Sequence, residues 1–309
     1  MRVAVMAAGA LGGYFGGRLA EAGHEVHFIA RGAHGEAIAR NGLKVESPVG
    51  DMLIKPAHVT DNPKKIGVVD VVLFAVKLWD TEKSGELCRP FLDKNTRVLS
   101  MLNGIDSVDR LTPILGDVVC AAPTRISAVI SAPGVIAHNG TFANFRCGFL
   151  DGRDDARLKS LVDEMRSAKV EATFSTNIRK SLWEKFVFLV GVSGATAGTR
   201  SPMGPILADP DTRALFESLM RETEAVAVKS GVEIAGEAEK LIQVASGMGA
   251  HIKASMLEDL ERGNRLELDW LQGKVVELGK KLGVPTPANE YVYKTLKLLR
   301  NGKPNKAAS

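Results

Sequence analysis

The chain has 309 residues, enough for two domains that each bury a hydrophobic core. Hydrophobic residues make up 45% and charged residues 25% of the sequence, an ordinary balance for a globular protein. The net charge is +4 and no long block of lysine and arginine occurs, which argues against a nucleic-acid partner and suits a small anionic ligand. The apolar runs are too short or too rich in Gly, Ser and Thr to predict a membrane span.

The three cysteines, Cys88, Cys120 and Cys147, are widely spaced and form no CxxC pair. The six histidines form no HExxH motif. We therefore expect neither disulfides nor a structural zinc or other metal site, and we predict a reducing, cytoplasmic compartment. A secretory signal at the N-terminus is rejected, because its n-region holds only Arg2 and glycines dilute the apolar run.

The first 31 residues have the order of a dinucleotide-binding βαβ unit, with strands predicted over 3–6 and 26–29 and a helix between them. The turn before the helix is Ala7-Ala8-Gly9-Ala10-Leu11-Gly12, in which alanine replaces the usual first glycine. Gly9 would let the backbone approach a pyrophosphate, and Gly12 would let the helix pack closely on the strand. The helix N-terminus would attract the phosphates. The alternative is an ordinary glycine-containing turn without a ligand.

Arg31 follows the second strand, where NAD-dependent enzymes usually carry Asp or Glu to bind the ribose 2′-hydroxyl. An arginine there accommodates a 2′-phosphate, so NADP(H) is favoured over NAD; the alternative is a solvated surface arginine. Lys77 follows a solid apolar strand predicted over 71–76 and Asn103 follows a strand predicted over 97–102, so both lie at the edge where α/β sheets bind ligands. Either could instead be an ordinary loop residue, since Asn-Gly is a common turn dipeptide.

The remaining segments complete an N-terminal domain over residues 1–175. Residues 43–54 predict a hairpin appended to the sheet. Residues 118–149 predict antiparallel strands, with turns at Pro133-Gly134 and Asn139-Gly140. Helices are predicted over 81–89 and 157–167, and a last strand over 170–174.

Beyond this point nearly every segment has helical periodicity, which predicts an all-helical second domain over 176–309. Its helices are expected over 178–192, 211–231, 237–246, 257–283 and 288–299, with prolines between several of them. The predicted fold class is α/β: an N-terminal Rossmann-type parallel-sheet domain plus an all-helical C-terminal domain. The long apolar helices near the C-terminus are consistent with a homodimer.

Lys185 lies in the predicted helix over 178–192, which is apolar on every side after that residue. Ile178, Leu182 and Leu189 fall on the same stripe as Lys185. An amine aimed into such a seam needs a ligand or partner, and burial lowers its pKa toward the range useful for proton transfer. The alternative is a lysine whose stem lies on apolar surface while its ammonium group reaches water. Both interpretations stay open on these residues alone.

Several stretches carry a more specific signal: AAGALG at 7–12, Arg31, Lys77, Asn103-Gly104, Pro133-Gly134-Val135, NIRKSLWEKF at 177–186 and SMLEDLERGNRLELDWL at 255–271. In this order, over nearly the whole chain, they resemble the ketopantoate reductase family (2-dehydropantoate 2-reductase). The resemblance implies a Rossmann domain, an all-helical domain and an active site in the cleft between them. It also implies reduction of ketopantoate to pantoate with NADPH, on the way to pantothenate and coenzyme A.

The resemblance implies a role for each matching residue. Lys185 matches the catalytic general acid, and Asn103 matches the asparagine near the nicotinamide and the substrate. Ser255 matches a substrate-binding serine, and Glu267 matches the glutamate that orients the substrate hydroxyls. Arg31 and Lys77 match positions that meet the adenosine 2′-phosphate.

Two positions on the helix of the matching lysine depart from the family, which commonly has substrate-binding asparagines where this chain has Leu189 and Ser193. Leucine cannot form a hydrogen bond and serine is shorter, although Ser193 keeps a polar group for the substrate. A site that recognises its substrate through hydrogen bonds discriminates strongly between substrates. The change therefore predicts either a different 2-oxo acid as substrate or a looser selectivity among 2-oxo acids.

Three hypotheses follow. The first is an NADPH-dependent reductase of a 2-oxo acid, with ketopantoate as the first substrate to try. The second is a relative of the same architecture that acts on another 2-oxo acid, such as a different branched one, or on a β-hydroxy acid. The third is a non-catalytic NADP(H)-binding sensor, which has no use for Lys185, Ser255 or Glu267.

Overall fold

The computed structural model describes residues 1–303, and these form two compact units. The first unit contains Met1–Leu102 and Asp106–Ile178, and the second contains Asn103–Ile105 together with the chain from Arg179 onward. Each unit has its own cluster of buried apolar side chains. The last six residues of the predicted helical domain, 304–309, lie outside the described range. Among the described helices, none combines the length and the hydropathy that a membrane span requires.

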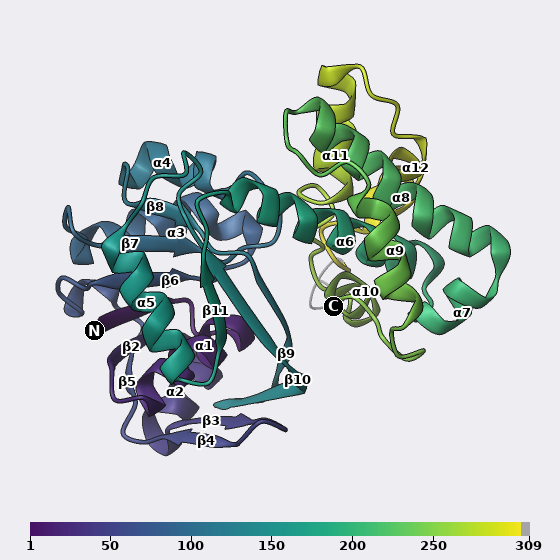
Figure 1. Cartoon of the computed structure of the whole chain (residues 1–309). Coiled ribbons are helices and arrows are strands. Elements are labelled where there is room, and N and C mark those ends of the chain that lie inside the picture. The colour runs from purple at the N-terminus through teal and green to yellow at the C-terminus, as the bar shows by residue number, and fades with distance from the viewer. Residues whose placement is uncertain (304–309) are drawn as a thin grey trace. The chain divides into compact units, whose positions relative to one another are not determined.

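A six-stranded parallel sheet with the order β5-β2-β1-β6-β7-β8 forms the centre of the first unit (Figure 1). Its strands are β1 (Arg2–Met6), β2 (Glu25–Ile29), β5 (His58–Thr60), β6 (Val71–Phe74), β7 (Arg97–Ser100) and β8 (Val119–Ala121). The sheet is the predicted Rossmann-type sheet, and the strand order reverses between β1 and β6. In such sheets ligands bind at the carboxyl ends of the strands beside this reversal.

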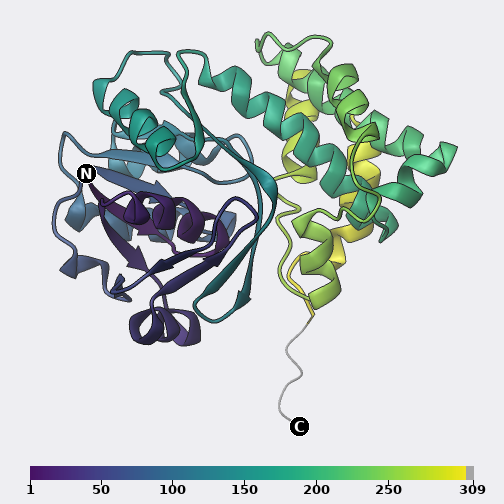
Figure 2. The same cartoon turned by 60° about the horizontal axis from the view of Figure 1, so that its bottom comes forward.

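Helices cover the sheet: α1 (Ala10–Glu21), α2 (Gly32–Asn41), α3 (Thr81–Cys88), α4 (Ser107–Leu115) and α5 (Ala156–Ser167), with short 3-10 turns η1 (Pro63–Lys65), η2 (Leu78–Asp80) and η3 (Arg89–Phe91). Figure 2 shows α1 lying across the strands. Its glycines allow a close approach, since a Cβ on Gly16 would lie 2.6 Å from Val5 Cγ2 and 2.9 Å from Phe28 Cε1. The helix is therefore held near the sheet at its first turns.

A second sheet of the first unit has the order β11-β10-β3-β4, with β9 paired antiparallel to β10. Its strands are β3 (Leu43–Glu46), β4 (Met52–Ile54), β9 (Thr124–Ala132), β10 (Val135–Cys147) and β11 (Glu171–Phe174). The predicted 43–54 hairpin forms, but it pairs with β10 and not with the parallel sheet. Two details of the 118–149 prediction were wrong: β8 is parallel to β7, and Asn139-Gly140 lies inside β10 at an irregular pairing instead of in a turn.

The second unit is helical, as predicted. Its elements are α6 (Ile178–Thr199), α7 (Met203–Ala208), α8 (Pro210–Lys229), α9 (Glu237–Ser246), α10 (Ser255–Arg262), α11 (Gln272–Leu282), α12 (Pro287–Leu296) and the 3-10 turn η4 (Lys297–Leu299). The single helix predicted over 257–283 was wrong, because Gly263 adopts a left-handed conformation with φ +73° and ends α10 there. The prediction also ended α6 too early, at 192.

Glycines inside α6 explain how this helix continues at the centre of the second unit. A Cβ on Gly191 would lie 2.3 Å from Met220 Cγ, and one on Gly194 would lie 2.6 Å from Gln272 Nε2. Glycine lowers helix propensity, but here it lets α8 and α11 approach the α6 backbone. Tertiary packing therefore decides the length of α6.

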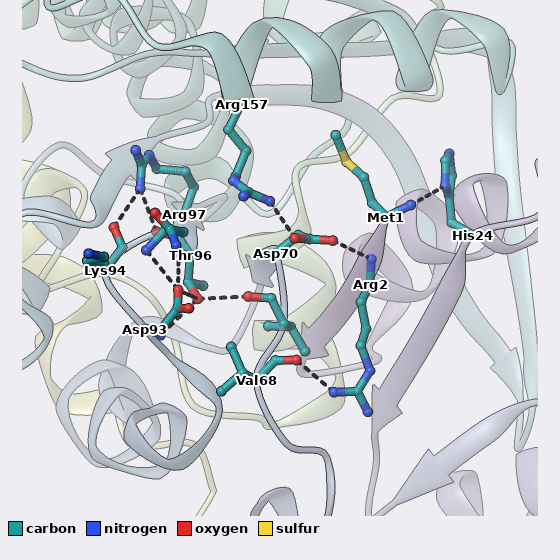
Figure 3. A network of polar contacts seen from close by, with 12 residues as sticks. Met1, Arg2, His24, Val68, Asp70, Asp93, Lys94, Thr96, Arg97 and Arg157 are labelled. Atoms are coloured by element: carbon teal, nitrogen blue, oxygen red, sulfur yellow. Dashed lines mark hydrogen bonds and ion pairs between the residues drawn. The ribbon is translucent and has the colours of Figure 1, made fainter.

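A polar network closes the amino-terminal edge of the parallel sheet, opposite the edge where ligands bind (Figure 3). The Asp70 carboxylate accepts a hydrogen bond from the Arg2 backbone N–H at 2.8 Å and another from Arg157 Nη1 at 2.5 Å. The Thr96 hydroxyl donates to the Val69 carbonyl at 2.7 Å. The hydrogen bond from Arg2, together with Arg157, lowers the pKa of Asp70. The network joins the starts of β1, β6 and α5.

Candidate functional site

The turn between β1 and α1 offers a half-buried helix N-terminus to an anion. Gly9 is the N-cap of α1 and no side chain caps the helix there, so the first N–H groups of α1 keep their hydrogen-bonding capacity. A Cβ on Gly9 would meet no atom within 4 Å, which leaves open space in front of the turn. The residues from Ala7 to Gly12 thus fit a bound diphosphate by charge and by space.

Gly12 has the packing role predicted for it. A Cβ there would lie 2.3 Å from the Ala7 carbonyl oxygen and 2.8 Å from Val5 Cγ1. No real side chain tolerates such distances, so only glycine lets α1 begin this close to β1. Ala7, at the position of the usual first glycine, still permits the turn.

Arg31 and Lys77 lie after the carboxyl ends of β2 and β6, the two strands that flank β1. Both side chains are exposed, and each residue is the N-cap of the next element, α2 for Arg31 and η2 for Lys77. The Lys77 ammonium lies 5.7 Å from the centroid of the Trp79 ring. Two cations therefore stand at the same edge of the sheet as the glycine turn, as the strand order predicts.

Asn103 and Glu267 meet in the second unit, although 164 positions separate them in the chain. Asn103 Nδ2 donates a hydrogen bond to Glu267 Oε2 at 3.0 Å. Only 7% of Glu267 is exposed. A buried carboxylate that accepts a neutral amide donor retains capacity for a further donor, such as a substrate hydroxyl.

Lys185 is half-buried in α6, and most of the helix after it is buried, with Phe188 and Leu189 half-buried. Its neighbours on the predicted stripe are Leu182, which is buried, and Leu189, which is half-buried. Ser193, one turn beyond Leu189, is fully buried, and its Oγ has no hydrogen-bond partner within residues 1–303. Ser255 is the exposed first residue of α10.

The structure thus gathers the predicted positions into groups. The glycine turn, Arg31 and Lys77 share one edge of the parallel sheet, and Asn103 and Glu267 are joined by a hydrogen bond. Lys185 and Ser193 share α6, and Ser255 begins α10.

One residue beside the glycine turn was missed by the sequence analysis. His34 in α2 lies within hydrogen-bonding distance of the Ala8 carbonyl, at 3.0 Å from its Nε2. Both of its partners are backbone groups, so no pattern of side chains in the sequence pointed to it.

The cysteines of the described chain are unpaired, and its acidic side chains, cysteines and histidines form no metal-binding cluster. All three thiols are free and buried, and burial raises the pKa of Cys147 to about 12. Within residues 1–303 no three His, Cys, Asp or Glu side chains are grouped in a way that could hold a metal ion.

Comparisons with known proteins match both units of the chain. The sequence model of the ketopantoate reductase PanE/ApbA family matches residues 3–152, and the model of that family's C-terminal domain matches residues 177–300. The chain is 32% identical to a 2-dehydropantoate 2-reductase of Mesorhizobium japonicum, over 97% of this chain and 98% of that one. It is 30% identical to an uncharacterized oxidoreductase, YkpB, of Bacillus subtilis, over 96% and 98% of the two chains.

A solved structure is similar over the same extent. The crystal structure of a PanE/ApbA family ketopantoate reductase from Ralstonia eutropha superposes with a TM-score of 0.88 at 32% identity, covering 97% of this chain and 98% of that one. These matches span both units, and the family consists of oxidoreductases that use a nicotinamide cofactor. The chain belongs to the ketopantoate reductase family.

Proposed function

We propose that the chain reduces the ketone of a small 2-oxo acid with NADPH, with ketopantoate, which becomes pantoate, as the first candidate. The observation that carries the proposal is the buried Glu267 carboxylate held by Asn103 in the same unit as the half-buried Lys185. A sheltered acceptor, an amide and an amine are the groups that bind a hydroxylated oxo acid and protonate its ketone. The printed name of the Mesorhizobium relative supports ketopantoate as the candidate.

The first unit would hold the cofactor, which supplies the hydride. The N–H groups at the start of α1 would bind its diphosphate, in front of the open space beside Gly9. Arg31 would bind the 2′-phosphate, because a guanidinium forms two parallel hydrogen bonds to a phosphate. Lys77 would add a second positive charge. Arg31 forms no ion pair or side-chain hydrogen bond within the described residues, so its guanidinium keeps this capacity.

The second unit would supply the acid. When the carbonyl carbon gains a hydride, negative charge grows on the carbonyl oxygen. Lys185 would stabilise that charge and then donate a proton from Nζ, so that an O–H bond forms and one N–H bond breaks. Asn103 and Glu267 would bind the polar groups of the substrate and hold its carbonyl in position.

The identity of the acid depends on Leu189 and Ser193. Leu189 presents only apolar surface on the face that it shares with Lys185, and Ser193 Oγ is buried without a partner within residues 1–303. These two features favour a second candidate of the same reaction class, a branched 2-oxo acid that offers fewer hydrogen bonds than ketopantoate.

A substrate panel tests the proposal. NADPH oxidation is followed by loss of its absorbance with ketopantoate and with branched 2-oxo acids that lack its hydroxyl, and the panel is repeated with NADH. We expect turnover of at least one acid, faster with NADPH, and a loss of that preference in Arg31→Ala. Tight NADPH binding without oxidation of NADPH by any acid would instead favour a sensor.

A further inference from the structure

His34 connects three segments of the first unit through its ring. It lies in the first turn of α2, its Nδ1 accepts a hydrogen bond from the Gly134 backbone N–H at 3.0 Å, and its Nε2 lies 3.0 Å from the Ala8 carbonyl oxygen. Gly134 belongs to the turn between β9 and β10, and Ala8 belongs to the glycine turn. The ring therefore bridges two turns that are remote in sequence.

The two partners determine which nitrogen carries the proton. A backbone N–H can only donate, so Nδ1 must be unprotonated to accept the hydrogen bond from Gly134. A carbonyl can only accept, so Nε2 carries the hydrogen and donates it to Ala8. The ring is thus neutral and has a single tautomer, and partial burial, which lowers the pKa of His34, favours the same state.

The bond to Ala8 controls the direction of the next amide. The Ala8–Gly9 peptide is trans, so its carbonyl and its N–H point in opposite directions. With the Ala8 carbonyl held on the His34 side, the Gly9 N–H points away from His34. A Cβ on Gly9 would meet no atom, so the space beside the turn is open to a ligand.

This peptide needs an external restraint because one of its residues is glycine. Rotating the peptide by half a turn changes ψ of Ala8 and φ of Gly9, and glycine accepts positive φ at no steric cost. The rotated peptide would present a carbonyl oxygen to the cofactor diphosphate in place of an N–H. The hydrogen bond from His34 opposes this rotation, since the rotation would leave the partly buried Nε2 hydrogen without its acceptor.

We infer that His34 is a positioning residue for the cofactor: it holds the Ala8–Gly9 peptide in the orientation that offers the Gly9 N–H to the diphosphate. The inference rests on the proposed function, because it takes the ligand of the glycine turn to be a dinucleotide. It adds a residue outside the turn whose role is orientation and not contact.

Two isosteric substitutions separate the two hydrogen bonds of His34. Glutamine can place its amide nitrogen near the position of Nε2, and asparagine can place its carbonyl oxygen near that of Nδ1. His34→Gln therefore keeps the donor to Ala8, His34→Asn keeps the acceptor for Gly134, and His34→Ala keeps neither. His24→Gln is the matched control, since His24 also forms two polar contacts, to the Met1 amine and to Glu164, at the opposite edge of the sheet.

The experiment measures the Kd for NADP⁺ by calorimetry and the Tm of each ligand-free variant. We expect the Kd to rise about tenfold in His34→Ala and His34→Asn, the loss of about one hydrogen bond, and to stay near the wild-type value in His34→Gln and His24→Gln. A merely structural role would make the Kd follow the Tm across all four variants. That correlation, or an unchanged Kd in His34→Ala, would overturn the inference.

A crystal structure of the ligand-free His34→Ala variant tests the peptide directly. We expect the Ala8 carbonyl to turn toward the open side of the turn in the variant, and an unturned peptide with an unchanged Kd would contradict the mechanism. A wild-type chain that binds no nicotinamide nucleotide would overturn the proposed function instead. The two failures are therefore distinguishable.

Discussion

Lys185 is the residue on which the proposed chemistry depends most. We predict that Lys185→Ala lowers kcat by roughly 10²–10⁴-fold, because general-acid assistance has about that value. The Kd for NADPH should stay within about twofold, since the glycine turn and Arg31 belong to the other unit. Stopped-flow turnover and calorimetry measure the two quantities. The control is Lys180→Ala, an exposed lysine of the same helix, which should leave kcat unchanged. Near wild-type turnover in Lys185→Ala would exclude the role.

The protonation state of His34 gives the second prediction at this scale. Its pKa is lowered in the folded chain, so the neutral ring and its contribution to stability persist above the unfolded-state pKa near 6.5 and are lost as the pH falls through the folded-state value. The protonated ring has a donor at Nδ1, facing the Gly134 N–H. NADP⁺ affinity should therefore fall at acidic pH more steeply in the wild type than in His34→Gln. Parallel pH profiles for the two proteins would contradict this.

Single residues of the candidate site were predictable to different degrees. Arg31 and Lys77 follow from chemistry alone, because a cation after a strand of a parallel sheet lies at the ligand edge. The same argument indicated Asn103, but its hydrogen bond to Glu267 was not predictable, since no local pattern brings together residues 164 positions apart, and only the family resemblance named Glu267. His34 was not predictable, because its partners are backbone atoms of other segments.

Gly9 and Gly12 serve different purposes in the βαβ unit of β1, α1 and β2: Gly12 lets the helix pack closely on the strand, and Gly9 leaves space for the diphosphate. In Gly12→Ala the new Cβ would lie 2.3 Å from the Ala7 carbonyl oxygen, so we expect the free energy of unfolding to fall by about 2 kcal/mol. In Gly9→Ala the Cβ meets no protein atom and φ is −72°, so stability should change by less than about 0.5 kcal/mol. The methyl group would enter the space of the diphosphate and raise the Kd for NADPH about tenfold or more.

Urea unfolding and calorimetry measure the two effects on the same pair of variants. We expect the two effects to separate: Gly12→Ala should lose stability, and Gly9→Ala should lose affinity for NADPH. A Gly9→Ala protein that binds NADPH as tightly as the wild type would show that the open space beside the turn is not the diphosphate site.

Elements were predictable where the pattern is strong and the partner is near in sequence. The solid apolar run of β6 indicated a buried parallel strand, and the helix pattern of α5 and α9 was correct. The helix α2 was not predicted, because two glycines weaken its helical pattern. The strands β5 and β8 are too short to show an alternation of apolar and polar residues. The joining of β3, β10 and β11 into one sheet depends on pairings between remote segments, which no local signal specifies.

At the scale of the whole molecule, the described chain is two units with separate apolar cores. Polar contacts contribute to the stability of a unit in addition to its core. The carboxylate of Asp70 serves the first unit in this way, because it accepts hydrogen bonds from Arg2 and Arg157. We predict that Asp70→Asn lowers the free energy of unfolding by about 1 kcal/mol, after allowance for partial exposure to solvent. The exposed Asp61, whose side chain forms no ion pair or hydrogen bond within residues 1–303, is the control position for the same substitution.

The effect of Asp70 should depend on pH in a known direction. Its pKa lies below the ordinary value of 3.8, so its stabilisation is complete above that value and disappears as the pH falls through the folded-state pKa. The stability difference between the wild type and Asp70→Asn should therefore be constant at neutral pH and shrink in acid. A difference that grows on acidification would contradict the network in Figure 3.

The order of domain types was predictable because the periodicity of the sequence changes once, from strands and helices to helices alone, near the start of α6. The assignment of Asn103–Ile105 to the second unit was not, since these residues directly follow a strand of the first. One contact explains part of this assignment, because the Asn103 amide donates a hydrogen bond to the Glu267 carboxylate of the second unit.

The most direct test of the proposed reaction follows one atom. NADPH carrying deuterium at both C4 positions is incubated with the chain and with the most active 2-oxo acid of the panel, and the product is examined by NMR. The account predicts a 2-hydroxy acid with one deuterium at C2, formed in the wild type and strongly reduced in Lys185→Ala. A product without deuterium at C2, or no reduced product from any 2-oxo acid, would contradict it.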